Sequence, residues 1–172
     1  HMAREIVHVG RKIRVEVDTF TAPDGTTIRR DLIRHPGAVV ILPVLDAGHV
    51  VLLRNHRFVI DETLCELPAG TLEPGEPLEE CAKRELIEET GYRAAQWRSL
   101  GFLYASPGVL DEKLHLFVAE ELTAGEASPE ACEQLEPVTV ALADAIRMCL
   151  SGEIKDAKTI TTLLLWERMQ RQ

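Results

Sequence analysis

Hydrophobic and polar residues alternate with a period of two near the start of the chain. The stretches 13–17 and 26–32 both show this alternation, and Pro23-Asp24-Gly25 stands between them. Pro, Asp and Gly favour tight turns for separate backbone reasons, so the pattern predicts a β-hairpin.

Longer apolar runs follow this hairpin. Residues 38–45 and 49–53 are nearly continuous in apolar side chains and are joined by Asp46-Ala47-Gly48. Such runs indicate buried strands, and the short connection predicts a second hairpin. Further strands are expected at 64–67, 98–104, 113–120 and 138–140.

Three segments are expected to be helical. Pro77 can serve as a first helical residue and Gly91 as a stop, which brackets a helix from about 77 to 90. Two more helices are expected at 142–150 and 157–170. Strands, a helix, strands again and then helices predict an α/β fold with mixed sheets.

The helix at 77–90 carries carboxylates where its apolar face should continue. At about 100° per residue, one face collects Leu78, Cys81, Ala82, Glu85, Glu88 and Glu89. Carboxylates gathered on an inward face repel one another and lose solvation unless cations compensate them. Hard divalent ions prefer such oxygen ligands, so the face predicts a divalent-cation site. A solvated acidic helix is the alternative interpretation.

Composition limits the class of protein. The 172 residues suffice for one domain with a core, and no apolar run approaches a membrane span or a signal-peptide core. Cys65, Cys81, Cys132 and Cys149 form no CxxC pair, which favours reduced thiols and a cytoplasmic location. His1-Met2 looks like the remnant of an expression tag and is excluded from the argument.

The negative charge is concentrated in one segment. Residues 73–89 hold seven Glu against Lys83 and Arg84, so a charge of −5 out of the total of −9 lies here. The sequence contains no basic stripe, which argues against a nucleic-acid partner. A small anionic ligand that brings Mg²⁺ with it remains compatible.

A signature box covers the same segment. It reads Gly70, five residues, Glu76, seven residues, and then Arg84-Glu85-Leu86-Ile87-Glu88-Glu89-Thr90-Gly91-Tyr92. This resembles the box of the Nudix hydrolases, and only Tyr92 departs, at a position where a bulky aliphatic residue is usual. The resemblance implies hydrolysis of a nucleoside diphosphate linked to another moiety. It also implies a Nudix-type α/β/α sandwich over 37–172, preceded by an additional N-terminal β element at 1–36 that commonly takes part in dimerisation.

Motifs outside the box resemble the ADP-ribose pyrophosphatase branch. They are Ser106-Pro107-Gly108, Glu66-Leu67-Pro68-Ala69-Gly70, Asp111-Glu112-Lys113 and Lys158-Thr159-Ile160. The branch implies a homodimer that cleaves ADP-ribose or a related ADP-sugar with Mg²⁺, or Mn²⁺ as a substitute. Two alternatives stay open: a hydrolase of GDP-mannose or UDP-glucose, and a non-catalytic regulator that binds ADP-ribose.

The resemblance also implies roles for the residues of the box. Glu85, Glu89 and the carbonyl of Ala69 would bind the metal, and Glu88 would hold it directly or through water. Glu76 would support this cluster. Arg84, which lies off the carboxylate face, would pair with a Glu and hold the geometry.

Residues outside the box are expected to supply the base and the substrate contacts. The general base would be Glu133, with Glu130 as the second choice. The substrate-binding candidates are Arg57, Arg54, Pro107, Gly108, Glu112, Arg30 and Phe20. Arg57 or Arg54 would bind a phosphate, Glu112 would accept hydrogen bonds from ribose hydroxyls, and Phe20 with Arg30 would reach the adenine across a dimer.

Overall fold

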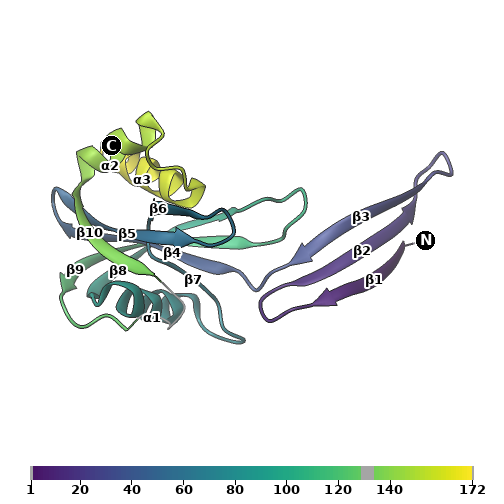
Figure 1. The fold of residues 1–172 in the computed structure, drawn as a ribbon, viewed down its shortest axis with the longest axis horizontal. Helices are drawn as coiled ribbons and strands as arrows, with labels where there is room; N and C mark the ends of the chain where they lie inside the picture. Colours follow the sequence, from purple (N-terminus) through teal and green to yellow (C-terminus); the bar gives the residue numbers. More distant parts are fainter. Residues whose placement is uncertain (1, 129–133, 172) are drawn as a thin grey trace.

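The N-terminal part of the chain forms a three-stranded antiparallel sheet. The computed structural model describes residues 2–128 and 134–171. The sheet contains β1 (Met2–Val9), β2 (Arg14–Thr21) and β3 (Thr27–Arg34), and it extends from the body as an arm (Figure 1). The predicted hairpin at β2 and β3 is confirmed, and Gly25 in its turn has a φ of +86°. Strand β1 was not predicted, because its sequence shows no clean alternation.

A seven-stranded sheet forms the centre of the body. Its main path is β10–β5–β4–β9–β8, with β6 added to β5 and β7 added to β4. The strands are β4 (Ala38–Asp46), β5 (His49–Arg57), β6 (Glu62–Glu66), β7 (Ala69–Thr71), β8 (Arg93–Tyr104), β9 (Lys113–Thr123) and β10 (Leu135–Ala141). β4 and β9 run parallel, whereas the other pairs are antiparallel, so the predicted mixed sheet is confirmed.

Helices cover both faces of this sheet, which gives the α/β/α sandwich (Figure 1). Val39 and Ile41 of β4 pack toward helix α1 (Leu78–Thr90). Val40 and Leu42 pack on the opposite side, toward α2 (Leu142–Ser151) and α3 (Ala157–Gln170). A strand covered on both faces needs apolar side chains at every position, which explains the continuous run in the sequence.

Helix α1 ends as predicted and buries Cys81 and Ala82 of its expected apolar face, together with Leu86 beside them, while Leu78 at its start departs from that face. Gly91 has a φ of +76°, and its N–H bonds to the carbonyl of Ile87. Leu86 is fully buried, whereas Leu78 remains 37% exposed, so the prediction that Leu78 anchors the helix was wrong. Leu78 lies about 80° from Leu86 around the helix, at its first turn. None of the helices in the described ranges combines the length and apolar character needed to cross a membrane.

The end of the arm is fastened to the connection between β8 and β9. The Ile33 N–H donates to the Val109 carbonyl at 2.8 Å, and the Asp111 N–H donates to the Ile33 carbonyl at 3.1 Å. Arg34 joins the two parts through its side chain, at 2.9 Å from Glu16 and 3.0 Å from Asp111. The arm is therefore tied to the loop that carries the predicted substrate residues.

Candidate functional site

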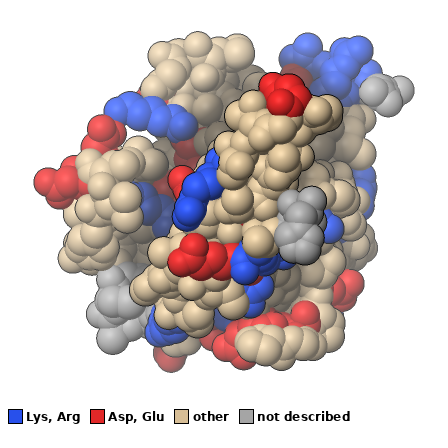
Figure 2. Space-filling view, turned by 90° about the vertical axis from the view of Figure 1, so that its right-hand side faces the viewer, with Lys and Arg blue, Asp and Glu red and all other residues tan. Residues whose placement is uncertain are grey.

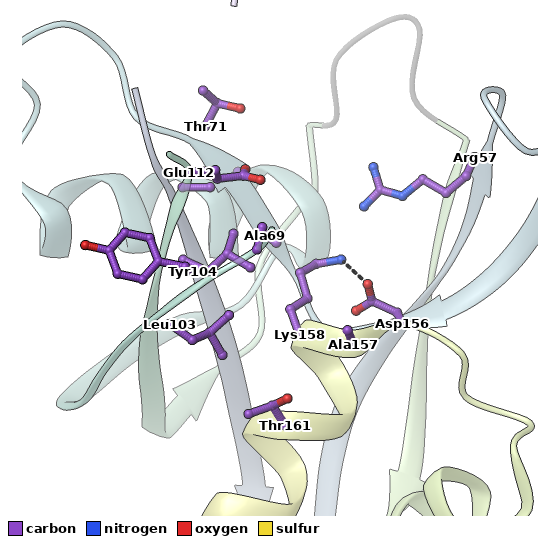
Figure 3. Close-up of a pocket in the computed structure, with 14 residues that line it drawn as sticks. Arg57, Ala69, Thr71, Leu103, Tyr104, Glu112, Asp156, Ala157, Lys158 and Thr161 are labelled. Carbon is purple, nitrogen blue, oxygen red and sulfur yellow. Dashed lines mark ion pairs between the residues drawn. The ribbon is translucent and has the colours of Figure 1, made fainter. Parts of the chain in front are cut away.

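Two adjoining cavities lie between the sheet, α1 and α3. The first, called the acidic cavity, has a volume of about 600 Å³ and is lined by Glu85, Glu88 and Glu89 of α1. The second, called the α3 cavity, has a volume of about 560 Å³ and reaches the first turn of α3 (Figure 3). Arg57, Ala69, Gly70 and Thr71 line both cavities. The two cavities thus form a continuous site with an acidic end.

Arg84 holds the carboxylates of the acidic cavity. Its Nε and Nη2 donate to the two oxygens of Glu76 at 2.8 and 3.0 Å. Its Nη1 donates to Glu85 at 2.7 Å and to Glu88 at 3.0 Å. These hydrogen bonds lower the pKa of Glu76 to about 2 and keep its carboxylate ionised. One guanidinium therefore orients three carboxylates.

The segment that contains β7 approaches α1 closely. The Ala69 N–H donates to Oε2 of Glu89 at 2.9 Å, and Glu89 is 5% exposed. A Cβ at Gly70 would lie 1.8 Å from the carboxyl carbon of Glu85. Only glycine can occupy this position without moving the carboxylate, so Gly70 permits Glu85 to lie against the backbone.

The donor set fits a hard divalent cation. Three carboxylates of α1 line the acidic cavity beside Ala69 and Gly70, and oxygen ligands of this kind suit Mg²⁺ and Mn²⁺. Within the described part of the chain, no three His, Cys, Asp or Glu side chains are already converged in a metal-ligating group. The Arg84 guanidinium bonds to Glu85 and Glu88 and provides the positive charge in this arrangement.

Arg57 lies where the two cavities meet, and its side chain is bound to Glu66. Nε and Nη2 donate to the two Glu66 oxygens at 2.8 and 2.5 Å. Lys158 of α3 adds a third bond to Glu66 at 2.6 Å. Burial would raise the pKa of Glu66, but the Arg57 hydrogen bonds and the Lys158 charge outweigh it, so the pKa lies below its ordinary value. Glu66 is thus a buried, ionised partner for two cations.

Three of the predicted substrate residues, Pro107, Gly108 and Glu112, lie in the β8–β9 connection. Glu112 lines the α3 cavity and lies 3.4 Å from Nδ1 of His35. Pro107 lines a separate cavity of about 250 Å³ between this connection and β3 of the arm. Glu112 therefore faces the site directly, whereas Pro107 is placed at the junction with the arm.

The other predicted substrate residues lie away from both cavities. The Arg54 side chain is 62% exposed, lies 3.8 Å from Glu136 and lines neither cavity, so its phosphate contact stays a prediction. Arg54 and Arg57 are three positions apart on β5, so their side chains point to opposite faces of the strand. Gly108 also lines neither cavity. Arg30 and Phe20 contact each other on the arm, with the guanidinium carbon 5.7 Å from the ring centre.

Both candidates for the general base fall in the segment 129–133. Glu133 and Glu130 both lie outside the described residues, which resume at Gln134. Their proposed role stays a prediction.

Several residues of the site were not predicted. Arg11 and Lys12, from the turn between β1 and β2, line the acidic cavity opposite α1. No local pattern marks them, because their place depends on how the arm is set against the body. Glu66 and Lys158 stand in stretches that resemble the ADP-ribose pyrophosphatase branch, yet their contact joins residues 92 positions apart.

Charges of both signs surround the site. Figure 2 views the molecule from the side of the arm, and acidic and basic side chains are interspersed over this face. The acidic cavity itself combines carboxylates with Arg11, Lys12, Arg57 and Arg84. Cations and carboxylates side by side suit an anionic ligand that arrives with a metal ion.

An α/β/α sandwich with an arginine-held carboxylate face beside further cations suits a class of enzyme that acts on phosphate compounds together with a divalent cation. Residues 34–163 match the family model described as the NUDIX domain, and the chain belongs to the Nudix family. Members of this family generally use divalent metal ions.

Relatives and solved structures agree with this assignment. The chain is 40% identical over 176 residues to an ADP-ribose pyrophosphatase of Bacillus subtilis, covering 99% of this chain and 95% of the relative. It is 36% identical over 156 residues to a GDP-mannose pyrophosphatase of Cronobacter sakazakii, covering 84% and 81%. A crystal structure of an ADP compounds hydrolase superposes with a TM-score of 0.83 at 25% identity, covering 98% of this chain and 92% of that one.

Proposed function

We propose that this protein hydrolyses the pyrophosphate bond of ADP-ribose, or of a related ADP-sugar, to give AMP and ribose 5-phosphate. The single observation that carries the proposal is the shared cavity of Glu85, Glu88, Glu89 and the Arg57 guanidinium. The similarity to an ADP-ribose pyrophosphatase along nearly the whole chain supports the same substrate. The reaction adds one water molecule across the bond, so each product carries one phosphate.

The acidic end of the site would hold Mg²⁺, with Mn²⁺ as a substitute. Glu85, Glu89 and the Ala69 carbonyl would be the ligands, and Glu88 would contribute directly or through water. When bound, the metal neutralises the pyrophosphate oxygens and orients the attacking water. Arg84 holds Glu85 and Glu88 in place from the side, and Glu76 fixes Arg84.

The remaining residues would bind the substrate and move the proton. Arg57 would bind a phosphate oxygen where the two cavities meet. Its guanidinium is hydrogen-bonded to Glu66, and the residue lines both cavities. Glu112 would accept hydrogen bonds from ribose hydroxyls in the α3 cavity. Glu133, or else Glu130, would accept the proton of the attacking water.

The first alternative is a hydrolase of GDP-mannose or UDP-glucose, which the similarity to a GDP-mannose pyrophosphatase supports. The deciding experiment measures kcat/KM with Mg²⁺ for ADP-ribose, GDP-mannose and UDP-glucose. Products are identified by mass after reaction in H₂¹⁸O, which also reveals the phosphorus that water attacks. A tenfold advantage of GDP-mannose or UDP-glucose over ADP-ribose would overturn the substrate assignment.

The second alternative, a non-catalytic regulator that binds ADP-ribose, is disfavoured. All carboxylates of the box are present, and three of them line one cavity. The same experiment tests this alternative. Tight binding of ADP-ribose without release of AMP would support a regulator and contradict hydrolysis.

The protein would act as a cytoplasmic homodimer in which the arm completes the site. Ile6, Val7 and Val9 of β1 are between 56% and 70% exposed, and Arg30 and Phe20 lie on the neighbouring strands. These features suit contact with a second copy. Sedimentation should show a dimer, and specific activity should fall on dilution below its dissociation constant. A fully active monomer would contradict the dimer.

A further inference from the structure

The clamp on Arg57 determines which edge of its guanidinium can meet a ligand. Nε and Nη2 are directed to Glu66, which forms the two parallel bonds described above. A guanidinium is planar, and its Nε–Nη2 edge is taken up by the Glu66 carboxylate. Its remaining nitrogen, Nη1, therefore lies on the edge that points away from Glu66. The Arg57 side chain is 43% exposed and lines both cavities. The orientation of its phosphate-binding edge therefore depends on Glu66.

Glu66 is bound from outside the β5–β6 hairpin as well as from within it. In the β5–β6 pairing, Arg57 lies opposite Glu62 and Glu66 lies opposite Leu53. The Arg57 side chain must therefore extend along the hairpin to reach Glu66. The Glu66 side chain is only 2% exposed, so water contributes little to its orientation. The direction of the carboxylate is therefore set by its charged partners, Arg57 and Lys158.

Lys158 is the second of these partners, and the first turn of α3 fixes it. Its Nζ lies 2.6 Å from Glu66 and 2.9 Å from Asp156, and the side chain is 11% exposed. Asp156 caps the helix by accepting from the Thr159 N–H at 3.0 Å. Figure 3 shows Lys158 and Asp156 paired at the start of α3, with the Arg57 guanidinium directed into the same cavity.

The same turn also braces the chain next to Glu66. Oγ1 of Thr159 accepts the Leu67 N–H at 2.8 Å. Leu67 directly follows Glu66 and leads to the Ala69-Gly70 segment of the acidic cavity. Helix α3 therefore binds both the Glu66 carboxylate, through Lys158, and the backbone of the next residue, Leu67, through Thr159.

We infer that Lys158 is a positioning residue of the hydrolase: through Glu66 it orients Arg57, and so it controls how tightly the substrate's pyrophosphate is bound. The inference rests on the proposed function, in which Arg57 binds a phosphate oxygen. Lys158 lines the α3 cavity, but its ammonium group is shared between Glu66 and Asp156, so it acts through Glu66 rather than as a direct ligand of the phosphate. Lys158 and Arg57 each carry one positive charge, and Glu66 and Asp156 each carry one negative charge, so the net charge of this cluster is zero before a ligand binds.

The first test separates substrate binding from turnover. Lys158→Met should raise KM for ADP-ribose by roughly tenfold, a typical coupling between contacting residues, while kcat changes by less than about threefold. Lys158→Arg keeps a cation at this place and should recover most of the loss. A fall in kcat with an unchanged KM would overturn the inference, as would a Lys158→Arg variant no better than Lys158→Met.

Lys155 provides a matched control. It precedes α3 by two residues and pairs with Glu62 of the same strand β6 at 2.7 Å, but both side chains are at least half exposed. It lines neither cavity. Lys155→Met should therefore leave KM and kcat unchanged. An equal rise of KM in Lys155→Met would assign the effect to general charge loss and overturn the inference.

The second test asks whether Lys158 acts through Arg57. Arg57→Gln should itself raise KM, and adding Lys158→Met to it should raise KM no further. Effects that multiply in the double variant would mean that Lys158 acts independently, which overturns the inference. If Lys158→Met does not fold, as judged by circular dichroism, Glu66→Gln with Lys158→Met removes both charges together. This double variant should then show the KM of Glu66→Gln alone, and a further change would contradict the coupling.

Different results would contradict the substrate assignment and the role of Lys158. The tests use whichever nucleotide sugar the wild-type protein hydrolyses fastest, since the pyrophosphate is common to all of them. Faster hydrolysis of GDP-mannose overturns the substrate proposal while leaving the cycle with Arg57 intact. If the wild-type protein hydrolyses the nucleotide sugar and Lys158→Met has the same KM and kcat, only the inference on Lys158 is overturned. Absence of any nucleotide-sugar hydrolysis overturns both.

Discussion

Arg84 binds the Glu76 carboxylate through two parallel hydrogen bonds, from Nε to Oε1 at 2.8 Å and from Nη2 to Oε2 at 3.0 Å. The pair joins the loop before α1 to the middle of that helix. Because the same guanidinium also reaches Glu85 and Glu88, the fixed position of Glu76 determines where those carboxylates point.

Replacing Arg84 should therefore weaken metal binding rather than unfold the protein. Arg84→Lys keeps a positive charge but loses the planar fork, so Glu85 and Glu88 are no longer held together. We expect the Mg²⁺ affinity and kcat to fall about 10- to 100-fold, as for other residues that orient metal ligands. Magnesium titrations of activity provide the measurement. Lys83→Met, which affects only the outer pairs with Glu79 and Glu80, should behave as wild type.

The Glu76–Arg84 pair should contribute to stability in a pH-dependent way. The pKa of Glu76 is lowered from 4.5 to about 2 in the folded state. A lowered pKa stabilises the fold above the unfolded value, and this contribution is lost as the pH falls from 4.5 through about 2. The difference in the free energy of unfolding between wild type and Glu76→Gln should be constant near neutral pH and shrink in this acidic range. Urea titrations across these pH values measure the difference. A difference in the free energy of unfolding that stays constant over the whole pH range would contradict the prediction.

Adding one methyl group at Gly70 should disable the site. The new Cβ would lie 1.8 Å from the Glu85 carboxyl carbon and 1.9 Å from its Oε1, so the carboxylate must move. Displacement of a catalytic group by about 1 Å can cost about 100-fold in rate, and Gly70→Ala should lose activity on this scale while remaining folded. Gly48→Ala is the control, since its Cβ would find Asp46 Oδ1 no closer than 3.7 Å. Full activity of Gly70→Ala would show that Glu85 is not needed in this position.

The general base can be tested without knowing where its loop lies. Glu133→Gln should lower kcat by at least ~100-fold, the usual contribution of a general base. Glu136→Gln serves as a comparison, because this side chain is 71% exposed and lies 3.8 Å from Arg54. Near-normal turnover of Glu133→Gln would remove it from the mechanism, and Glu130→Gln would then be measured in the same assay.

Short stretches of sequence were sufficient to predict most elements. Helix α1 begins next to Pro77 and ends at Gly91, because a proline and a glycine act on the local backbone. The continuous apolar run of β4 predicted a strand buried on both faces, and the structure confirms it. The hairpin around Gly25 follows from its turn residues. In each case the signal spans only a few residues.

Predictions that depended on which side of an element faces the core were less reliable. Leu78 was expected to be buried and is 37% exposed, because the inward face of α1 is turned toward Leu86. Arg54 lines neither cavity, although Arg57, three residues later on the same strand, lines both. Periodicity shows which residues share a face, but contact with other layers decides how that face is oriented.

The carboxylates that suit a divalent cation could be predicted from the sequence, because they are spaced along a single helix and need no distant partner to be recognised. The residues that surround these carboxylates could not, because they are brought there by packing between elements far apart in the chain. The contact of Glu85 with Gly70, the binding of Arg57 to Glu66, and the bond from Lys158 to Glu66 across 92 residues all arise where separate elements meet. Such contacts depend on how the chain packs in three dimensions, which no local pattern encodes.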